Sequence, residues 1–337
     1  MNKPITIAVD AMGGDNSPEK VIKGIALHSS KSEDVFYKIF GDENLLNPLI
    51  NKLLKKKNYQ IFHTDKKISN EDTALTAVKR GKQTSMWLAV ESVKKKESDI
   101  VVSAGNTGAL FVIAKFNLNM IPSIDKPALS ALWPNKNGMN IVLDLGANIE
   151  CNEKNLVDFS IMGSSLFKAL YPNDDAVVAL LNVGSEELKG NEIIKKAYQN
   201  LHNRNNNIFN FYGYVEGNQI MDGNVNVIVT DGFTGNVALK TAEGTANFIV
   251  NEFKNSMTSN ILGKISSLIN IQNLSKIKKK LDPRLYNGAI LIGLNSPVVK
   301  SHGSTDYIGF SNSLNVCIKI VKNNLIQKIK DNINTWE

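Results

Sequence analysis

One pattern recurs along this chain and constrains its fold more than any other. A short apolar run ends on a small polar residue and is followed at once by glycine and a helical stretch. The fullest case is Val-Asn-Val-Ile-Val-Thr-Asp-Gly-Phe-Thr-Gly-Asn-Val-Ala-Leu-Lys at 225–240, a buried-type strand that runs into a helix. Without a spacer, the Asp231 carboxylate and the free amides of the helix N-terminus face the same space. This favours a ligand site.

The same pattern occurs four more times, where apolar runs end at Asp10, Ser103, Asp144 and Asn182 and glycine follows within three residues. Strands that alternate with helices predict a mainly parallel sheet, whose strand-to-helix loops open on one edge. We therefore expect five polar loops to share one rim. No linker or low-complexity tract interrupts the chain, so residues 1–337 are predicted to form a single α/β domain.

Several long segments favour helices, namely 71–95, 152–171, 241–280 and 315–333. We expect 244–285 to be a helical arm within the domain, because its apolar residues have helical spacing and lysines lie beside them. The apolar positions are Ile261, Leu262, Ile265, Leu268 and Ile269, and the lysines include Lys276, Lys278 and Lys279. Two interpretations stay open: helices packed in a subunit interface, or a basic amphipathic tip on anionic lipid.

Composition narrows the class of protein. The chain is 42% hydrophobic and 21% charged, and it has neither a signal-peptide pattern nor an apolar run of membrane-spanning length. Its two cysteines, Cys151 and Cys317, form no metal or disulfide pattern, which fits the cytoplasm. The net charge of +7 favours acidic partners, whereas motifs for nucleic-acid binding are missing.

The missing motifs limit the chemistry. We find no zinc spacing, no serine nucleophile turn, no phosphate loop and no dinucleotide fingerprint, so we expect no metal and no cofactor, and a nicotinamide dehydrogenase is disfavoured. Backbone amides, Asn and Ser side chains, carboxylates and lysines remain. Such a set suits a reaction whose nucleophile comes with the substrate, such as phosphate attacking a thioester, because the protein then only positions both and stabilises the oxyanion.

Several motifs, in order, resemble the bacterial phosphate acyltransferase of phospholipid synthesis. They lie at 8–15, 103–110, 144–148, 182–184, 186–191, 215–217, 231–236, 281–283, 286–289 and 300–304. The resemblance implies transfer of a fatty acyl group from acyl carrier protein to inorganic phosphate. The acyl phosphate would serve a downstream membrane glycerol-3-phosphate acyltransferase. It also implies a homodimer and a three-layer α/β/α Rossmann-like sheet like isopropylmalate dehydrogenase and phosphotransacetylase, with peripheral contact to the inner face of the membrane through a projecting arm.

The matched loops supply candidate site residues. As catalytic residues we predict Asp231, Lys189, Lys300 and Asn236. As residues that bind phosphate or substrate we predict Asp10, Gly13, Gly14, Ser103, Asn106, Thr107, Asp144, Asn148, Lys240 and His302. The alternative for each lysine is an ordinary surface position, and for each asparagine a helix cap. If Asp231 is catalytic, Asp231→Asn cuts turnover with little change in melting temperature.

Two rival functions remain. The nearer one is a phosphotransacylase that uses acyl coenzyme A, which a test of both donors separates. The other is a non-catalytic scaffold for lipid-synthesis enzymes at the membrane surface, which would leave the crowded polar loops unexplained.

Overall fold

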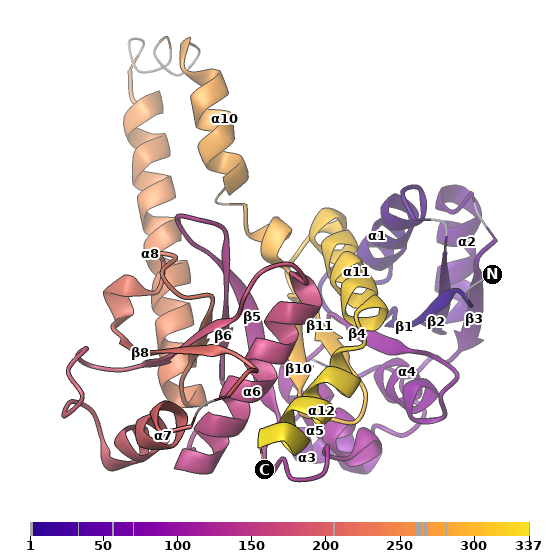
Figure 1. Cartoon of the computed structure of the whole chain (residues 1–337). Coiled ribbons are helices and arrows are strands. Elements are labelled where there is room, and N and C mark those ends of the chain that lie inside the picture. The colour runs from indigo at the N-terminus through magenta and orange to yellow at the C-terminus, as the bar shows by residue number, and fades with distance from the viewer. Residues whose placement is uncertain are drawn as a thin grey trace.

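The computed structural model describes residues 3–336 except positions 33, 56, 70, 205, 261–264, 266–268 and 281, with only the backbone at 277–280. Within these residues, eleven strands form one sheet in the order β3-β2-β1-β4-β11-β10-β5-β6-β9-β7-β8 (Figure 1). The strands are β1 (Ile5–Asp10), β2 (Val35–Gly41), β3 (Tyr59–His63), β4 (Ile100–Ser103), β5 (Ala128–Pro134), β6 (Met139–Leu143), β7 (Val177–Leu181), β8 (Asn210–Val215), β9 (Val227–Val229), β10 (Ala289–Ile292) and β11 (Val298–Lys300).

Helices cover both faces of this sheet. They are α1 (Glu19–Ser29), α2 (Glu43–Leu53), α3 (Ala74–Arg80), α4 (Ser85–Lys94), α5 (Thr107–Leu118), α6 (Glu153–Leu170), α7 (Glu192–His202), α8 (Gly232–Thr258), α10 (Ile271–Lys280), α11 (Tyr307–Lys322) and α12 (Leu325–Trp336), with short 3-10 helices η1 (Gly217–Gln219) and η2 (Pro283–Tyr286).

The side-chain alternation of the strands assigns these helices to layers. On β4, Ile100 and Val102 pack in the core that holds α1, α6 and α11, whereas Val101 packs in the core of α4 and α5. On β6, Val142 points away from α6 into a third core, which α8 borders. Successive strand residues face opposite sides of a sheet, so the molecule has helix, sheet and helix layers. The predicted three-layer α/β/α fold is confirmed.

The two halves of the sheet run in opposite directions. Strands β1, β2, β3, β4 and β11 are mutually parallel, and so are β6, β7, β8 and β9. Between them, β11 to β10, β10 to β5 and β5 to β6 are three antiparallel steps, an odd number. The carboxyl ends of the two halves therefore point to opposite edges. The expectation that all five polar loops share one rim is wrong, because it assumed one direction for the whole sheet.

Two long helices that we expected are interrupted. The 71–95 segment splits into α3 and α4 at Gly81, and Gln83 between them takes a left-handed φ of 70°. Thr73 and Thr84 each cap the helix that follows. The C-terminal segment breaks likewise at Asn324, with a φ of 50°. Periodicity missed both breaks, because the apolar face continues across them.

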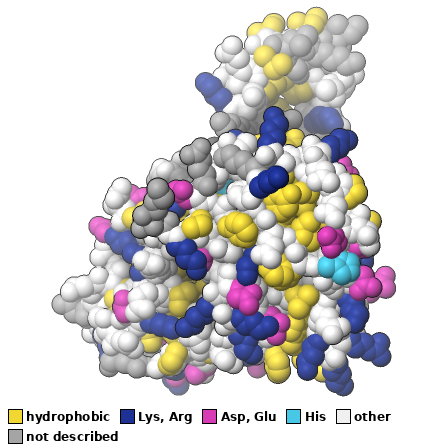
Figure 2. Space-filling view, turned by 90° about the vertical axis from the view of Figure 1, so that its right-hand side faces the viewer, with side chains coloured by type: hydrophobic (Ala, Val, Ile, Leu, Met, Phe, Trp, Pro, Cys, Tyr) yellow, Lys and Arg dark blue, Asp and Glu magenta, His cyan; other side chains and the backbone are white. Residues whose placement is uncertain are grey.

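The arm rises from the body as α8 and α10, the two orange helices of Figure 1. Helix α8 begins at Gly232, earlier than expected, and ends at Thr258. Ile265 and Ile269 are exposed, whereas Ile261, Leu262 and Leu268 and the side chains of Lys278 and Lys279 fall outside the described part. Figure 2 shows apolar side chains on the arm, and Lys and Arg side chains spread over the body with a group at the lower right.

Candidate active site

A buried carboxylate marks the carboxyl end of β1. The register pairs Asp10 with Ser103 of β4, and the Ser103 hydroxyl donates a 2.6 Å hydrogen bond to it. The Ser85 hydroxyl, at the first residue of α4, donates another of 2.6 Å. Asp10 is only 1% exposed. Burial raises the pKa of this carboxyl, and the hydroxyl donors oppose that shift.

Two lysines converge near this carboxylate. Lys300 ends β11, where its register partner is Ser103, and Lys20 lies in the first turn of α1. Lys300 is 9% exposed and Lys20 is 4% exposed. The Lys20 ammonium donates to the carbonyl of Gly303, and the Lys300 ammonium donates to the carbonyl of Ser301. Buried ammonium groups that donate hydrogen bonds to carbonyls carry a positive charge that a bound anion would compensate.

Electrostatics agree with this placement. Burial lowers the pKa of Lys300 to about 8, and the charge of Lys20 acts in the same direction while Asp10 opposes it. Burial also lowers the pKa of Lys20. The two ammonium groups therefore repel one another beside a single buried carboxylate. A bound anion would relieve that repulsion. We call Asp10, Lys20, Ser85, Ser103 and Lys300 the lysine cluster.

Glycines let the loops meet over this cluster. A Cβ on Gly13 would lie 2.6 Å from an Asp10 carboxylate oxygen and 2.6 Å from the amide nitrogen of Gly105. Gly14 has a φ of +82°, and a Cβ there would lie 2.9 Å from the Lys20 ammonium. The loops after β1 and β4 thus need glycine for close approach, and their backbone is left near the cationic groups.

The rim of the cluster comes from three further segments. Asn106 caps α5 by accepting from the Ala109 amide, so the free amides of that helix start beside the glycine loops. The backbone amide of His302 donates 2.9 Å to Asn287. Burial and the Lys300 charge lower the pKa of the His302 imidazole, on which Glu243 and Lys240 also act. The charges of Glu243 and Lys240, both on α8, therefore act at this loop.

A second cluster lies at the carboxyl ends of β6 and β9, on the other edge. Asp144 is fully buried, and one carboxylate oxygen accepts from the amides of Leu129 and Ala147 at 2.9 and 3.1 Å. The other accepts from the amide and side-chain nitrogens of Asn148 at 2.7 and 2.8 Å. Burial raises the pKa of Asp144, and these four donors oppose that shift. Its hydrogen-bonding capacity is used within the protein.

The neighbours of Asp144 also have structural partners. Asp231 caps α8, accepting from the Thr234 amide and hydroxyl, each at 2.8 Å. Asn236 donates 3.3 Å to the carbonyl of Leu145. Lys189 is exposed in the loop after β7, on the same edge. We call Asp144, Asn148, Asp231 and Asn236 the Asp144 cluster. Unlike the lysine cluster, this group of described residues contains no buried cation.

The predicted site residues thus fall into two groups. The lysine cluster and its rim gather Asp10, Gly13, Gly14, Ser103, Asn106, Thr107, Lys300 and His302, with Lys240 of α8 close by. Asp144, Asn148, Asp231, Asn236 and Lys189 lie at the other edge. Lys20 was missed, and one signal pointed to it: it begins the apolar face of its helix, next to Val21 and Ile22, where an exposed lysine is not expected.

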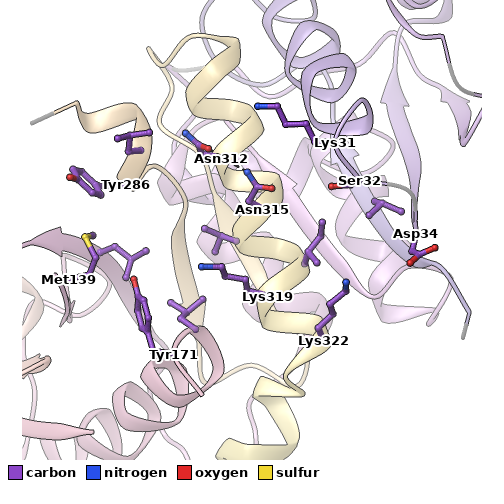
Figure 3. A pocket seen from close by; sticks show the side chains of 16 residues that line it. Lys31, Ser32, Asp34, Met139, Tyr171, Tyr286, Asn312, Asn315, Lys319 and Lys322 are labelled. Atoms are coloured by element: carbon purple, nitrogen blue, oxygen red, sulfur yellow. Dashed lines mark hydrogen bonds between the residues drawn. The ribbon is translucent and has the colours of Figure 1, made fainter. Parts of the chain in front are cut away.

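A pocket of about 630 Å³ lies elsewhere, along α11. In Figure 3, Asn312, Asn315, Lys319 and Lys322 follow that helix, with Met139, Tyr171 and Tyr286 on one side and Lys31 on the other. None of the described residues of either polar cluster lines it. The pocket is therefore separate from both polar clusters.

The fold and the lysine cluster define an α/β protein in which two buried lysines lie beside glycine-rich loops. A family model described as fatty acid synthesis protein matches residues 5–328. The phosphate acyltransferase of Pelagibacter ubique is 67% identical over 333 residues, covering 99% of this chain and 100% of that protein. That of Rhodospirillum rubrum is 44% identical, covering 99% and 95%. The chain belongs to the phosphate acyltransferase family and is an acyltransferase.

Solved structures agree on the fold. A phosphotransacetylase from Streptococcus pyogenes aligns with a TM-score of 0.64 at 15% identity, covering 96% of this chain and 95% of that one. The EutD phosphotransacetylase from Staphylococcus aureus aligns with a TM-score of 0.62 at 15% identity, covering 95% and 94%. At such identities the likeness concerns the Rossmann-like architecture alone.

Proposed function

We propose that the chain transfers a fatty acyl group from acyl carrier protein to inorganic phosphate at the lysine cluster, producing acyl phosphate for phospholipid synthesis. The observation that carries this proposal is the pair of buried ammonium groups, Lys20 and Lys300, beside glycine loops and a helix N-terminus. Two cations with one buried carboxylate suit a dianion. The family membership supports a phosphate acceptor in particular.

The chemistry needs little from the protein beyond placement and charge. A phosphate oxygen attacks the thioester carbonyl carbon, the carbon–oxygen bond forms and the carbon–sulfur bond breaks. The proton that hydrogen phosphate carried ends on the released carrier thiol. Lys20 and Lys300 would hold the phosphate and stabilise the negative charge on the carbonyl oxygen, a contribution of roughly 3 kcal/mol per well-placed donor. Asp10 would orient Lys300.

The test is phosphate-dependent release of carrier thiol from long-chain acyl carrier protein, together with hydroxylamine trapping of acyl phosphate. Both products are expected. A folded protein that gives neither product with any thioester donor would overturn the proposal and favour a scaffold role. Efficient turnover of acyl coenzyme A, with none of acyl carrier protein, would favour the rival phosphotransacylase.

We further propose that the arm joins two copies of the chain. Phe248, Ile249, Val250 and Phe253 of α8 are all about half exposed or more, which is costly for a helix in water. A Phe248→Glu and Phe253→Glu double variant is expected to be monomeric by light scattering. A persistent dimer with lost binding to anionic vesicles would assign the arm to the membrane instead. Within the described residues, no helix is both long and apolar enough to cross a bilayer.

A further inference from the structure

A group of basic side chains on the body has no assigned role. Five exposed cations, Lys66, Lys67, Lys79, Arg80 and Lys82, lie between β3 and α4, and we call them the cationic loop. The ion pairs of the described residues involve none of them. Among the described residues, none of the five therefore has an ion-pair partner.

Internal hydrogen bonds bring the two parts of the loop together. The Lys66 ammonium donates 2.7 Å to the Gln83 side chain, and the Lys66 carbonyl accepts from the Ser85 amide at 3.0 Å. Lys66 and Lys67 thus lie beside the turn that carries Lys82. Of the nearby carboxylates, Asp65 flanks this group, whereas Glu71 and Asp72 precede the other end of α3. The C-terminal end of α3 is left strongly positive.

Hydrogen bonds attach the segment between β3 and α4 to the lysine cluster and to its rim, one on each side of α3. Ser85, three residues after Lys82, donates 2.6 Å to Asp10. On the other side of α3, the Asn106 side chain donates 3.0 Å to the carbonyl of Asp72. Anything that docks on the cationic loop is therefore held next to the glycine loops. The surface also has an apolar component, since Leu75 of α3 is 64% exposed and Phe116 of α5 is 59% exposed.

We propose that the cationic loop is the docking surface for the acidic carrier protein that presents the acyl thioester, an inference that rests on the proposed function. Charge complementarity steers such an encounter and fixes its register, and an exposed leucine and phenylalanine supply apolar contact. A lipid surface fits less well. In Figure 1, α3 lies at the end of the body away from the tip of the arm, so both could not rest on one bilayer.

The experiment reverses the charge of Lys79, Arg80 and Lys82 together to glutamate. Initial rates are measured with long-chain acyl carrier protein and with the same acyl group on pantetheine, which has no carrier. We expect KM for acyl carrier protein to rise about tenfold or more and to lose its salt dependence. The rate with acyl pantetheine should not change, because none of the three residues lies in the lysine cluster.

Two further proteins make the result interpretable. The matched control reverses Lys31, Lys52 and Lys322, which are also exposed but lie on α1, α2 and α11 or directly after them, and it should keep the wild-type KM. A neutral Lys79→Ala, Arg80→Ala and Lys82→Ala variant guards against misfolding of the reversed one. Its KM should rise less, by about threefold, since it removes attraction without adding repulsion.

The outcomes separate the two proposals. Equal rate losses with both donors, or an unchanged KM, in an enzyme whose wild type is active would overturn the docking surface and leave the proposed function standing. A variant with unchanged KM that no longer binds anionic vesicles would assign the loop to lipid. A wild type without activity on acyl carrier protein would overturn both.

Discussion

The two halves of the sheet follow the same sequence pattern yet build different sites. After β1, β4 and β11, the polar residues form the lysine cluster, where two buried ammonium groups lie near one buried carboxylate, Asp10, and the exposed Asp15 acts on Lys20. After β6 and β9, the same kind of loop forms the Asp144 cluster, where a buried carboxylate accepts four hydrogen bonds from its own surroundings. The lysine cluster has more buried cations than buried carboxylates. The buried carboxylate of the Asp144 cluster has its hydrogen bonds supplied by the protein.

This difference distinguishes a cluster that can bind a ligand from one that stabilises the fold. A buried group whose hydrogen bonds are satisfied internally stabilises the fold and gains no hydrogen bond from a ligand. Buried cations in excess destabilise the empty protein and are compensated when an anion arrives. Small polar residues after a strand therefore do not distinguish a ligand site from a structural cluster. The hydrogen-bond and charge partners of those residues do.

The strongest test of the comparison is Lys300→Met, which keeps the apolar stem and removes the charge. We expect kcat/KM for phosphate to fall about 10²- to 10³-fold, because a transition-state cation is lost. The melting temperature should not fall, since a buried charge is removed. Lys189→Met, at the other edge, is the control and should change little. Similar losses for both lysines would break the distinction between the halves.

Asp144→Ala should act on stability instead. It leaves four donors without their acceptor, so we expect a loss of roughly 3 kcal/mol in the free energy of unfolding. Denaturant titration measures this loss, and kcat per folded molecule should be retained. The exposed Asp125, which makes only a 3.5 Å pair with Lys154, is the matched control, and Asp125→Ala should cost less than about 1 kcal/mol. An inactive yet stable Asp144→Ala would refute the supporting role.

The pH profile sharpens the assignment to Lys300. Its pKa in the folded protein is lowered to about 8 by burial, so phosphate binding that needs the ammonium weakens above that pH. We expect kcat/KM for phosphate to fall about tenfold per pH unit above pH 8. The phosphate-free protein should gain stability there, because the unfolded chain then binds more protons. Lys300→Arg should lose this alkaline fall in its pH profile, and its persistence would exclude Lys300 as the titrating group.

The smallest effect concerns Asp231. Its oxygens cap α8, so Asp231→Ala should cost about 1 kcal/mol and Asp231→Asn only a few tenths, because asparagine caps as well. Thermal melts and kcat together decide between cap and catalyst. The cap geometry and the prediction from sequence that Asp231→Asn cuts turnover therefore give different expected outcomes. A large drop in kcat at unchanged melting temperature would restore Asp231 to the reaction.

Much of the fold could be read from the chain. The β-branched runs before Asp10, Ser103 and Asp144 became strands as predicted, since a buried strand needs little more than such a run and a turn. The breaks at Gly81 and Asn324 could not be read, because left-handed residues leave the apolar periodicity intact. Of the lysine cluster and its surroundings, the sequence pointed to Lys300 and the glycine loops, whereas Lys20 lies within a helix and was missed.

The sequence by itself determined the family, the strand-and-helix order and the loops that carry polar residues, because these depend on local pattern and motif. Only the tertiary structure decided which loops meet. Three antiparallel steps, β11 to β10 to β5 to β6, reverse the direction of half of the sheet and place similar motifs at opposite edges. Strand direction depends on pairings between distant segments, such as Ile290 with Ser130, which no local signal encodes.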